Sequence, residues 1–161
     1  MFLLCISVTE VTQILSVLIA ITTCVFFGWQ VRQKIGMSHA EQVSKMMTKV
    51  QDDPVLQDFF YDIEYNRFNY STQFHGSDKE KTADKILHHY EYILYLHERG
   101  LLKDEEFRFF EYDIQKIVRN KDMIKYFLNL YKYCDEDLSF KYQRLLDYGE
   151  DKGYITKKFN K

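Results

Sequence analysis

A long apolar run without charge stands near the start of the chain. Residues 11–29 contain no Asp, Glu, Lys or Arg, and ten of these nineteen residues are Val, Ile, Leu or Phe. As an α-helix the run would be about 28 Å long, close to the roughly 30 Å of bilayer hydrocarbon. Its large apolar side chains contribute about −3 to −6 kcal/mol toward insertion, and its hydroxyl groups can bond back to the helix backbone. The pattern predicts that residues 1–29 form a short outer segment and one transmembrane helix.

Two other interpretations of this run stay open. A cleaved or lipidated signal sequence is equally apolar, but no Lys or Arg precedes Arg32, and Thr22-Thr23-Cys24 is a poor lipoprotein cleavage site. A core helix of a soluble protein is the second alternative, although eighteen or more uncharged residues favour a membrane span. We expect the single anchor.

The residues that flank the run predict its orientation. Trp29 stands where an interfacial aromatic ring would lie, and Arg32 and Lys34 follow it directly, whereas no basic residue precedes the run. The positive-inside rule then places the N-terminus outside and the rest of the chain in the cytoplasm, at the inner membrane. Arg32 and Lys34 are expected to contact anionic lipid, so the bilayer is the first predicted partner. Of the three cysteines, Cys134 suits a reducing compartment as a free thiol.

The polar part of the chain continues the helical pattern. Residues 30–53 contain no Pro and are predicted to form a juxtamembrane helix, with a bend at Gly36. An apolar stripe at helical spacing on this segment favours self-association, and it comprises Val43, Met46, Met47 and Val50. Asp53-Pro54 has the form of an N-cap followed by Pro at the first helical position, so a new helix begins there.

Residues 54–153 are predicted to form a helical domain. The apolar spacing gives helices that begin at Pro54, at Ser77 or Asp78, near Asp104, after a break at residues 120–122, and at residues 135–137. The longest loop is residues 69–78, one helix stops at Gly100, the last ends near Gly153, and residues 154–161 form a flexible tail. No segment alternates with period two long enough to be a strand. The fold class is therefore all-α, an N-terminal transmembrane helix followed by a cytoplasmic bundle of about five helices.

The composition narrows the classes of partner. With 22 Lys and Arg against 24 Asp and Glu, a net charge of −2 gives no general attraction to nucleic acid, and none is expected to bind. The 13 Phe and 13 Tyr suit a half-wet interface with a protein partner, or reflect drift in an A+T-rich genome.

Few side chains suggest chemistry. Asp84, His88 and Glu91 lie on one predicted helix face and are the strongest metal candidates, but a solvated face explains them as well and no cofactor is expected. His97 falls on the apolar stripe, where a neutral, hydrogen-bonded histidine is expected. Arg32 and His39 have the spacing of a helical ribonuclease motif, beside the bilayer. His75, Ser77 and Asp78 include hydrolase residue types, but Ser77 or Asp78 is better explained as an N-cap. No catalytic residue is predicted.

One stretch resembles a known family. It runs from Ile86-Leu87-His88-His89-Tyr90-Glu91-Tyr92-Ile93 through Leu96 to Gly100-Leu101-Leu102-Lys103-Asp104-Glu105-Glu106. This stretch resembles the uncharacterised bacterial membrane-anchored helical proteins of domain-of-unknown-function family 4760. The resemblance implies an N-terminal membrane helix, a helical cytoplasmic region and a bacterial origin, and it implies no activity and no site.

Two functions from different classes follow. The first is a single-pass, membrane-anchored helical module for interaction or regulation, which binds an unidentified protein or another copy of itself. The alternative is a membrane-localised hydrolase or defence effector that uses a His/acidic pair such as His88 with Glu91.

Overall fold

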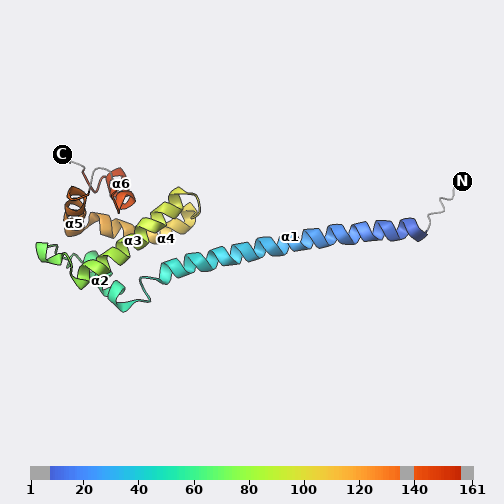
Figure 1. Cartoon of the computed structure of the whole chain (residues 1–161), viewed down its shortest axis with the longest axis horizontal. Helices are drawn as coiled ribbons and strands as arrows, with labels where there is room; N and C mark the ends of the chain where they lie inside the picture. The colour runs from blue at the N-terminus through green and yellow to red at the C-terminus, as the bar shows by residue number, and fades with distance from the viewer. Residues whose placement is uncertain (1–7, 135–139, 157–161) are drawn as a thin grey trace. The chain divides into compact units, whose positions relative to one another are not determined.

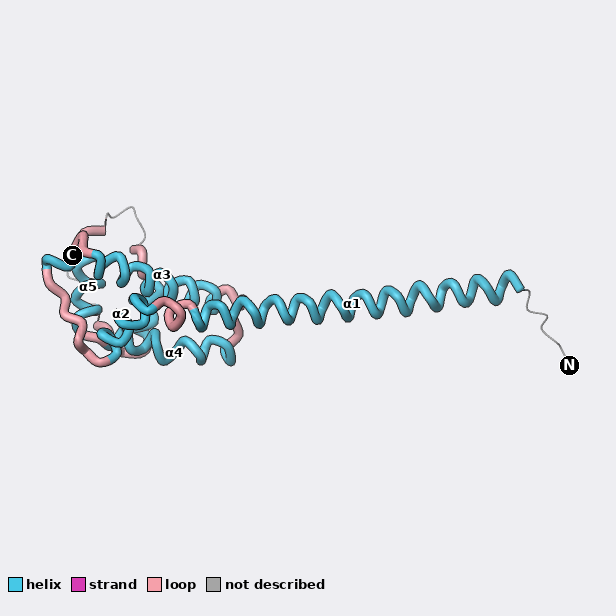
Figure 2. Tube along the Cα trace, turned by 90° about the horizontal axis from the view of Figure 1, so that it is seen from below, coloured by secondary structure: helices cyan, strands magenta, loops and turns pink. Residues whose placement is uncertain are grey.

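The chain is helical wherever the structure gives it regular secondary structure. The computed structural model describes residues 8–134 and 140–156, with side chains from residue 11 onward. The elements are α1 (Val8–Thr48), α2 (Pro54–Glu64), the 3₁₀ helix η1 (Thr72–Phe74), α3 (Asp78–Glu98), α4 (Asp104–Arg119), α5 (Lys121–Lys132) and α6 (Gln143–Asp151) (Figures 1 and 2). The described residues contain no strand, so the all-α prediction with five α-helices after the first is confirmed. The chain divides into two compact units between Lys45 and Met46, and each is described by itself.

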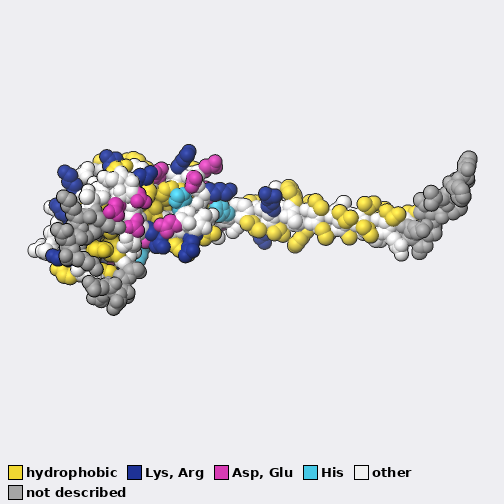
Figure 3. Space-filling model, turned by 90° about the horizontal axis from the view of Figure 1, so that it is seen from above, with side chains coloured by type: hydrophobic (Ala, Val, Ile, Leu, Met, Phe, Trp, Pro, Cys, Tyr) yellow, Lys and Arg dark blue, Asp and Glu magenta, His cyan; other side chains and the backbone are white. Residues whose placement is uncertain are grey.

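The first unit is built on one long helix with an apolar surface. α1 has 41 residues and continues without interruption through Gly36, where a bend was expected. Its apolar side chains are exposed, from Val11 at 51% to Trp29 at 55%, and Figure 3 shows them as yellow atoms along the rod. The hydroxyls of Ser16, Thr22 and Thr23 donate to carbonyls three or four residues back, at 2.7–3.0 Å. None of the most apolar window is buried, so α1 is not the core helix of this structure and is long and apolar enough to cross a membrane.

In the second unit, α2 and α3 begin at the capping residues predicted from the sequence. The Asp53 side chain accepts hydrogen bonds from the backbone N–H groups of Val55 at 3.0 Å and Leu56 at 3.4 Å, and Pro54 opens α2. The Ser77 hydroxyl accepts from the Glu80 N–H at 3.2 Å and caps α3. Both predicted N-caps are confirmed.

Helix α3 supplies the centre of the core. Its apolar face is fully buried and packs against α2, α4 and α6, while α4 also packs against α5. The most buried residues of α3 are Ala83, Ile86, Leu87, Tyr90 and Ile93.

The break between α4 and α5 is a single buried residue, Asn120. Its Oδ1 accepts from the N–H groups of Asp122 and Met123, both at 3.0 Å, and so caps α5. Its Nδ2 donates to the carbonyl oxygen of Ile63 at 2.9 Å, at the end of α2. Asn120 therefore joins three helices.

Two predictions about the C-terminal part need correction. The last helix begins at Gln143, whereas the acidic start predicted at residues 135–137 lies outside the described residues. Tyr154 and Ile155 donate backbone hydrogen bonds to the Gly149 carbonyl at 2.8 and 3.1 Å, and Ile155 is buried. A Cβ on Gly149 would lie 2.6 Å from Ile155 Cδ1, so the bare glycine admits the isoleucine side chain. Residues 154 and 155 are therefore packed, whereas 157–161 of the predicted tail lie outside the described residues.

Candidate functional site

The three predicted metal candidates on α3 contact two different places, Tyr142 for Asp84 and His88, and the first turn of α6 for Glu91. Asp84 accepts from the Tyr142 hydroxyl at 2.6 Å and from Lys141 Nζ at 2.9 Å. The His88 ring is exposed and lies edge-on to the Tyr142 ring, with centroids 5.4 Å apart. Glu91 binds backbone and guanidinium groups of α6. Among the described residues, no three His, Cys, Asp or Glu side chains converge in a way that would hold a metal ion.

Glu91 caps the N-terminus of α6 from a different helix. Its Oε2 accepts from the Leu145 N–H at 3.0 Å, and its Oε1 accepts from the Arg144 N–H and from Arg144 Nη1, both at 3.2 Å. Burial raises the pKa of the Glu91 carboxyl, although these hydrogen bonds oppose the rise. Tyr142, the N-cap residue itself, makes no side-chain cap bond, so Glu91 supplies the missing acceptor.

The other residues singled out in the sequence lie on α1 and near the end of α3. Trp29, Arg32 and Lys34 are exposed on α1, and His39 lies seven residues after Arg32 on the same helix. The His97 ring stacks on Phe107 with centroids 4.1 Å apart, and its Nε2 bonds to Asp104 at 3.0 Å. The expected hydrogen bond of His97 is confirmed, but its side chain stays 31% exposed rather than buried in the core.

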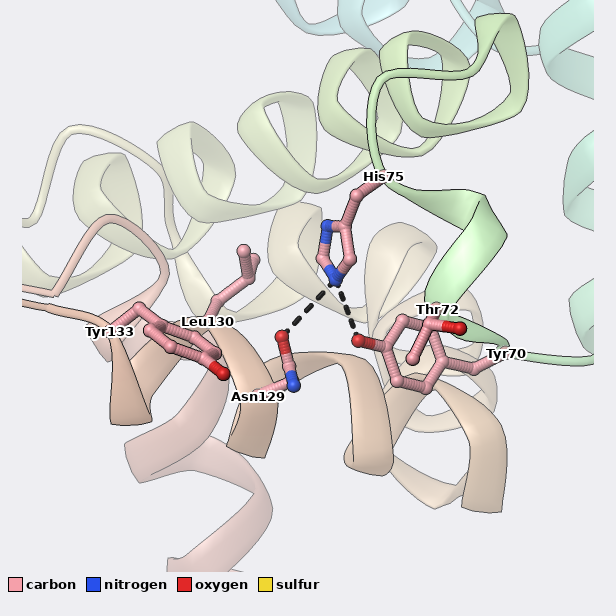
Figure 4. Close-up of a pocket in the computed structure, with 6 residues that line it drawn as sticks. All are labelled: Tyr70, Thr72, His75, Asn129, Leu130 and Tyr133. Carbon is pink, nitrogen blue, oxygen red and sulfur yellow. Dashed lines mark hydrogen bonds between the residues drawn. The ribbon is translucent and has the colours of Figure 1, made fainter.

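A pocket that the sequence did not predict lies between the loop before α3 and the end of α5. Its volume is about 400 Å³, and its lining residues are Tyr70, Thr72, His75, Asn129, Leu130 and Tyr133. Figure 4 shows the His75 ring pointing from the loop to a place between Asn129 and the Tyr70 hydroxyl. His75 Nε2 is 2.7 Å from the Tyr70 oxygen and 3.1 Å from Asn129 Oδ1.

The other ring nitrogen of His75 is held by a carboxylate. His75 Nδ1 is 2.8 Å from Glu80 Oε1, and Glu80 also accepts from the Gly76 N–H and from the Tyr126 hydroxyl at 3.1 Å. Burial alone would raise the pKa of Glu80, but these three donors outweigh it and hold the pKa below its usual value. Glu80 also lies in the first turn of α3, where the helix dipole favours negative charge. Because Nδ1 faces Glu80, Nε2 is the ring nitrogen that lies beside the lining residues Tyr70 and Asn129.

Gly76 allows the backbone turn that places His75 beside Glu80. Its φ is +77°, in the left-handed region that residues with a Cβ avoid. The turn at Gly76 brings its own N–H onto Glu80 and reverses the chain between His75 and the start of α3.

A chain of hydrogen bonds continues from Glu80 into the core. The Tyr126 hydroxyl lies 3.1 Å from Glu80 Oε1 and 3.2 Å from Asp84 Oδ1, and Tyr142 donates to the same oxygen of Asp84. Burial, together with the neighbouring carboxylates, raises the pKa values of Tyr126 and Tyr142 well above the usual value, so both stay protonated donors. Burial would raise the pKa of Asp84, but bonds from Tyr142, Lys141 and Tyr126 lower it overall.

The sequence analysis singled out the loop that holds His75 but predicted no partner for this residue. The Ser77 hydroxyl caps α3, as predicted, and donates to the Phe74 carbonyl at 2.6 Å. The partners of His75 include Glu80, five residues on, and Asn129, which is 54 residues away. A carboxylate in the first turn of a helix, shortly after a His-Gly pair, was the local signal for Glu80. Nothing local indicates Asn129, because a tertiary contact brings it to the pocket.

Comparison with known proteins found no relative of this chain. No family model matches the chain, and no curated protein or solved structure matches it.

Proposed function

We propose that this protein is a single-pass, membrane-anchored helical module for interaction or regulation, with its N-terminus outside and its helical domain in the cytoplasm of a bacterium. The observation that supports the proposal best is the surface of α1, which is uncharged and exposed on every side of the helix over residues 11–29. Exposing that much large apolar surface to water would be unfavourable, whereas lipid would cover it. The resemblance to family 4760 agrees with this layout.

The proposed orientation depends on Arg32 and Lys34. Both are exposed on α1 just after Trp29, which suits the interface on the cytoplasmic side. Alkaline phosphatase and a fluorescent protein, each fused after the C-terminus, test the orientation. We expect the fluorescent fusion to be bright and the phosphatase fusion inactive, and the opposite pair of results would contradict the proposal.

The interaction role rests on what anchoring does to a domain. Confinement to a surface raises its effective concentration for partners in the same membrane. Val50, from the stripe expected to self-associate, is buried inside the second unit, while Met47 is 37% exposed. Crosslinking in intact membranes should trap a dimer or a hetero-complex, and the same yield after the anchor is disabled would contradict a tether-dependent role. A strictly monomeric chain without partners would also contradict it.

A second candidate function, a membrane-localised hydrolase or defence effector, is favoured by one observation. His75 and Glu80 are hydrogen-bonded at the edge of a pocket, whereas His88 and Glu91 bind different groups. An activated aryl ester is the probe for this candidate. Turnover that His75→Gln abolishes would support it, and equal turnover in wild type and His75→Gln would contradict it.

A further inference from the structure

Four exposed aromatic side chains lie close together on α2 and α4, and we call them the aromatic patch. Their exposed fractions are 39% for Tyr61, 64% for Tyr65, 61% for Phe109 and 54% for Tyr112. The Tyr112 hydroxyl donates to Glu64 Oε1 at 2.5 Å, which joins the outer sides of the two helices. Tyr61 and Tyr65 lie on either side of Glu64 in the sequence, with ring centroids 6.0 Å apart, and Phe109 precedes Tyr112 by one turn of α4.

Charges of opposite sign border the aromatic patch on its two helices. The face of α4 away from its buried residues carries an excess of positive charge, with Arg108, Lys116 and Arg119 against Glu105. The outer side of α2 and the turn after it carry an equal excess of negative charge, with Asp58, Asp62 and Glu64 against Arg67. The other carboxylates of α4 bond to groups of α3, of α6 and of the turn before α4.

This pattern of charge is complementary to itself. In a pair of copies related by a two-fold axis, α4 of one copy can lie against α2 of its partner, so each positive side meets a negative side. The aromatic rings then meet between the two charged sides. An anionic bilayer would attract the α4 side but repel the α2 side, and a strongly acidic protein would do the same. A second copy of the chain is therefore the occupant that suits both sides at once.

The aromatic patch has a size that suits a tethered dimer. At about 150–250 Å² for a whole ring side chain, of which roughly half is exposed here, the four rings offer on the order of 400 Å² per copy. A stable interface needs roughly 800 Å² per partner, so the charged sides would have to supply the rest. Confinement to one membrane raises the effective concentration of the copies, so a modest affinity is sufficient.

We propose that the second unit binds a second copy of the chain through the aromatic patch. The proposal rests on the proposed anchoring and names its partner and its surface. The two can fail separately: a chain that alkaline carbonate releases from membranes has no anchor, whereas a chain that stays in the pellet without pairing through the patch has no such interface.

A photocrosslinking amino acid in place of Phe109 tests the surface in the full chain in intact membranes. With p-benzoylphenylalanine at this position, mass spectrometry should find an adduct to α2 or α4 of a second copy. The matched control carries the same group in place of Tyr92, which is 54% exposed on α3 and stacks on Tyr95. The control should give a self-adduct yield lower by about fivefold or more. Equal yields at the two positions, an adduct at position 109 only to lipid or to another protein, or no adduct there would overturn the proposal.

Charge reversal tests whether the two sides meet. Arg108→Glu combined with Lys116→Glu, or Asp58→Lys combined with Asp62→Lys, should each lower the self-adduct yield by about fivefold or more, because like charges then face each other. All four positions are accessible to solvent, so both variants should keep the wild-type circular dichroism spectrum. Co-expressed with different tags, the two variants should crosslink to each other at about the wild-type yield. An unchanged yield in either variant alone, or no recovery in the mixed pair, would overturn the proposal.

Discussion

Hydrogen bonds from tyrosine hydroxyls to carboxylates recur throughout the second unit. Each pair joins two different elements of the second unit: Tyr90 to Asp113, Tyr112 to Glu64, Tyr126 to Glu80 and Asp84, Tyr142 to Asp84, and Tyr148 to Glu111. Burial raises the pKa of Tyr148 to about 12, and it raises the pKa of Tyr90 further, so these phenols stay donors at neutral pH. Five of the 13 tyrosines therefore bond to carboxylates within the domain, and one of the five, Tyr112, also has a side chain that is 54% exposed.

Asn120 should be the most sensitive polar residue of the domain. Asn120→Ala removes the α5 cap and leaves the Ile63 carbonyl without its donor, so we expect the free energy of unfolding to fall by about 2–4 kcal/mol. Asn120→Ser keeps a capping oxygen and should lose only part of this. Urea denaturation in detergent, followed by near-UV circular dichroism, measures both. A loss under about 0.5 kcal/mol for Asn120→Ala would show that the residue does not join the helices.

His89 should make the domain sensitive to acid. It is 5% exposed, and burial, aided by nearby Lys49 and opposed by a bond to the Met46 backbone, lowers its pKa to about 4. The folded state therefore binds its proton only below the range in which an unfolded histidine does, so stability present above about pH 6.5 is lost as the pH falls toward about 4.

The difference between wild type and His89→Gln isolates this effect, because Gln does not titrate and still donates a hydrogen bond. Unfolding free energy should fall between about pH 6.5 and about 4 by up to about 3 kcal/mol more in wild type than in His89→Gln. Urea titrations across that range measure the difference. Parallel pH profiles would contradict a buried neutral His89.

Among the helices, those whose start is marked by neighbouring capping residues were predicted at the right place. The start of α6 is not marked in this way, and it was predicted at the wrong place. Asp53-Pro54, Ser77 and Asn120 carry their capping information in adjacent residues, and α2, α3 and α5 begin there. α6 begins at Gln143, and its cap comes from Glu91, about fifty residues earlier. The acidic run at residues 135–137 looked like a helix start, and only tertiary structure shows where the cap of α6 lies.

Because Glu91 on α3 caps α6, replacing its carboxylate should destabilise the domain. In Glu91→Gln only one oxygen remains to accept, and the new NH₂ faces backbone N–H groups, so the unfolding free energy should fall by about 1–3 kcal/mol. The matched control is Glu98→Gln, which also bonds to Arg144 but is 54% exposed, and should cost under about 1 kcal/mol. Hydrogen exchange should show the Leu145 amide deprotected in Glu91→Gln alone. Equal behaviour of the two variants would contradict the capping role.

At the scale of the whole molecule, the general plan was easier to predict from the sequence than the site. Hydrophobic spacing is a property of neighbouring residues, and it predicted both the long apolar helix and the five helices after it. The pocket is lined by His75 and Tyr70 from the segment before α3 and by Asn129 from α5, so no spacing in the sequence describes it. Tertiary contacts also decide where the side chains of Asp84, His88 and Glu91 lie, because Asp84 and His88 both contact Tyr142 whereas Glu91 binds the first turn of α6.

Alkaline carbonate extraction of membranes tests whether α1 lies in a lipid bilayer. The wild-type chain should stay in the membrane pellet. Leu18→Lys combined with Ile21→Lys should release it, because two central lysines cost about 5–7 kcal/mol, against a gain of about 3–6 kcal/mol from the apolar residues. Val55→Lys combined with Leu101→Lys, at exposed positions of the second unit, is the matched control and should stay in the pellet. Release of the wild-type chain, or retention of the Leu18/Ile21 variant, would contradict the account.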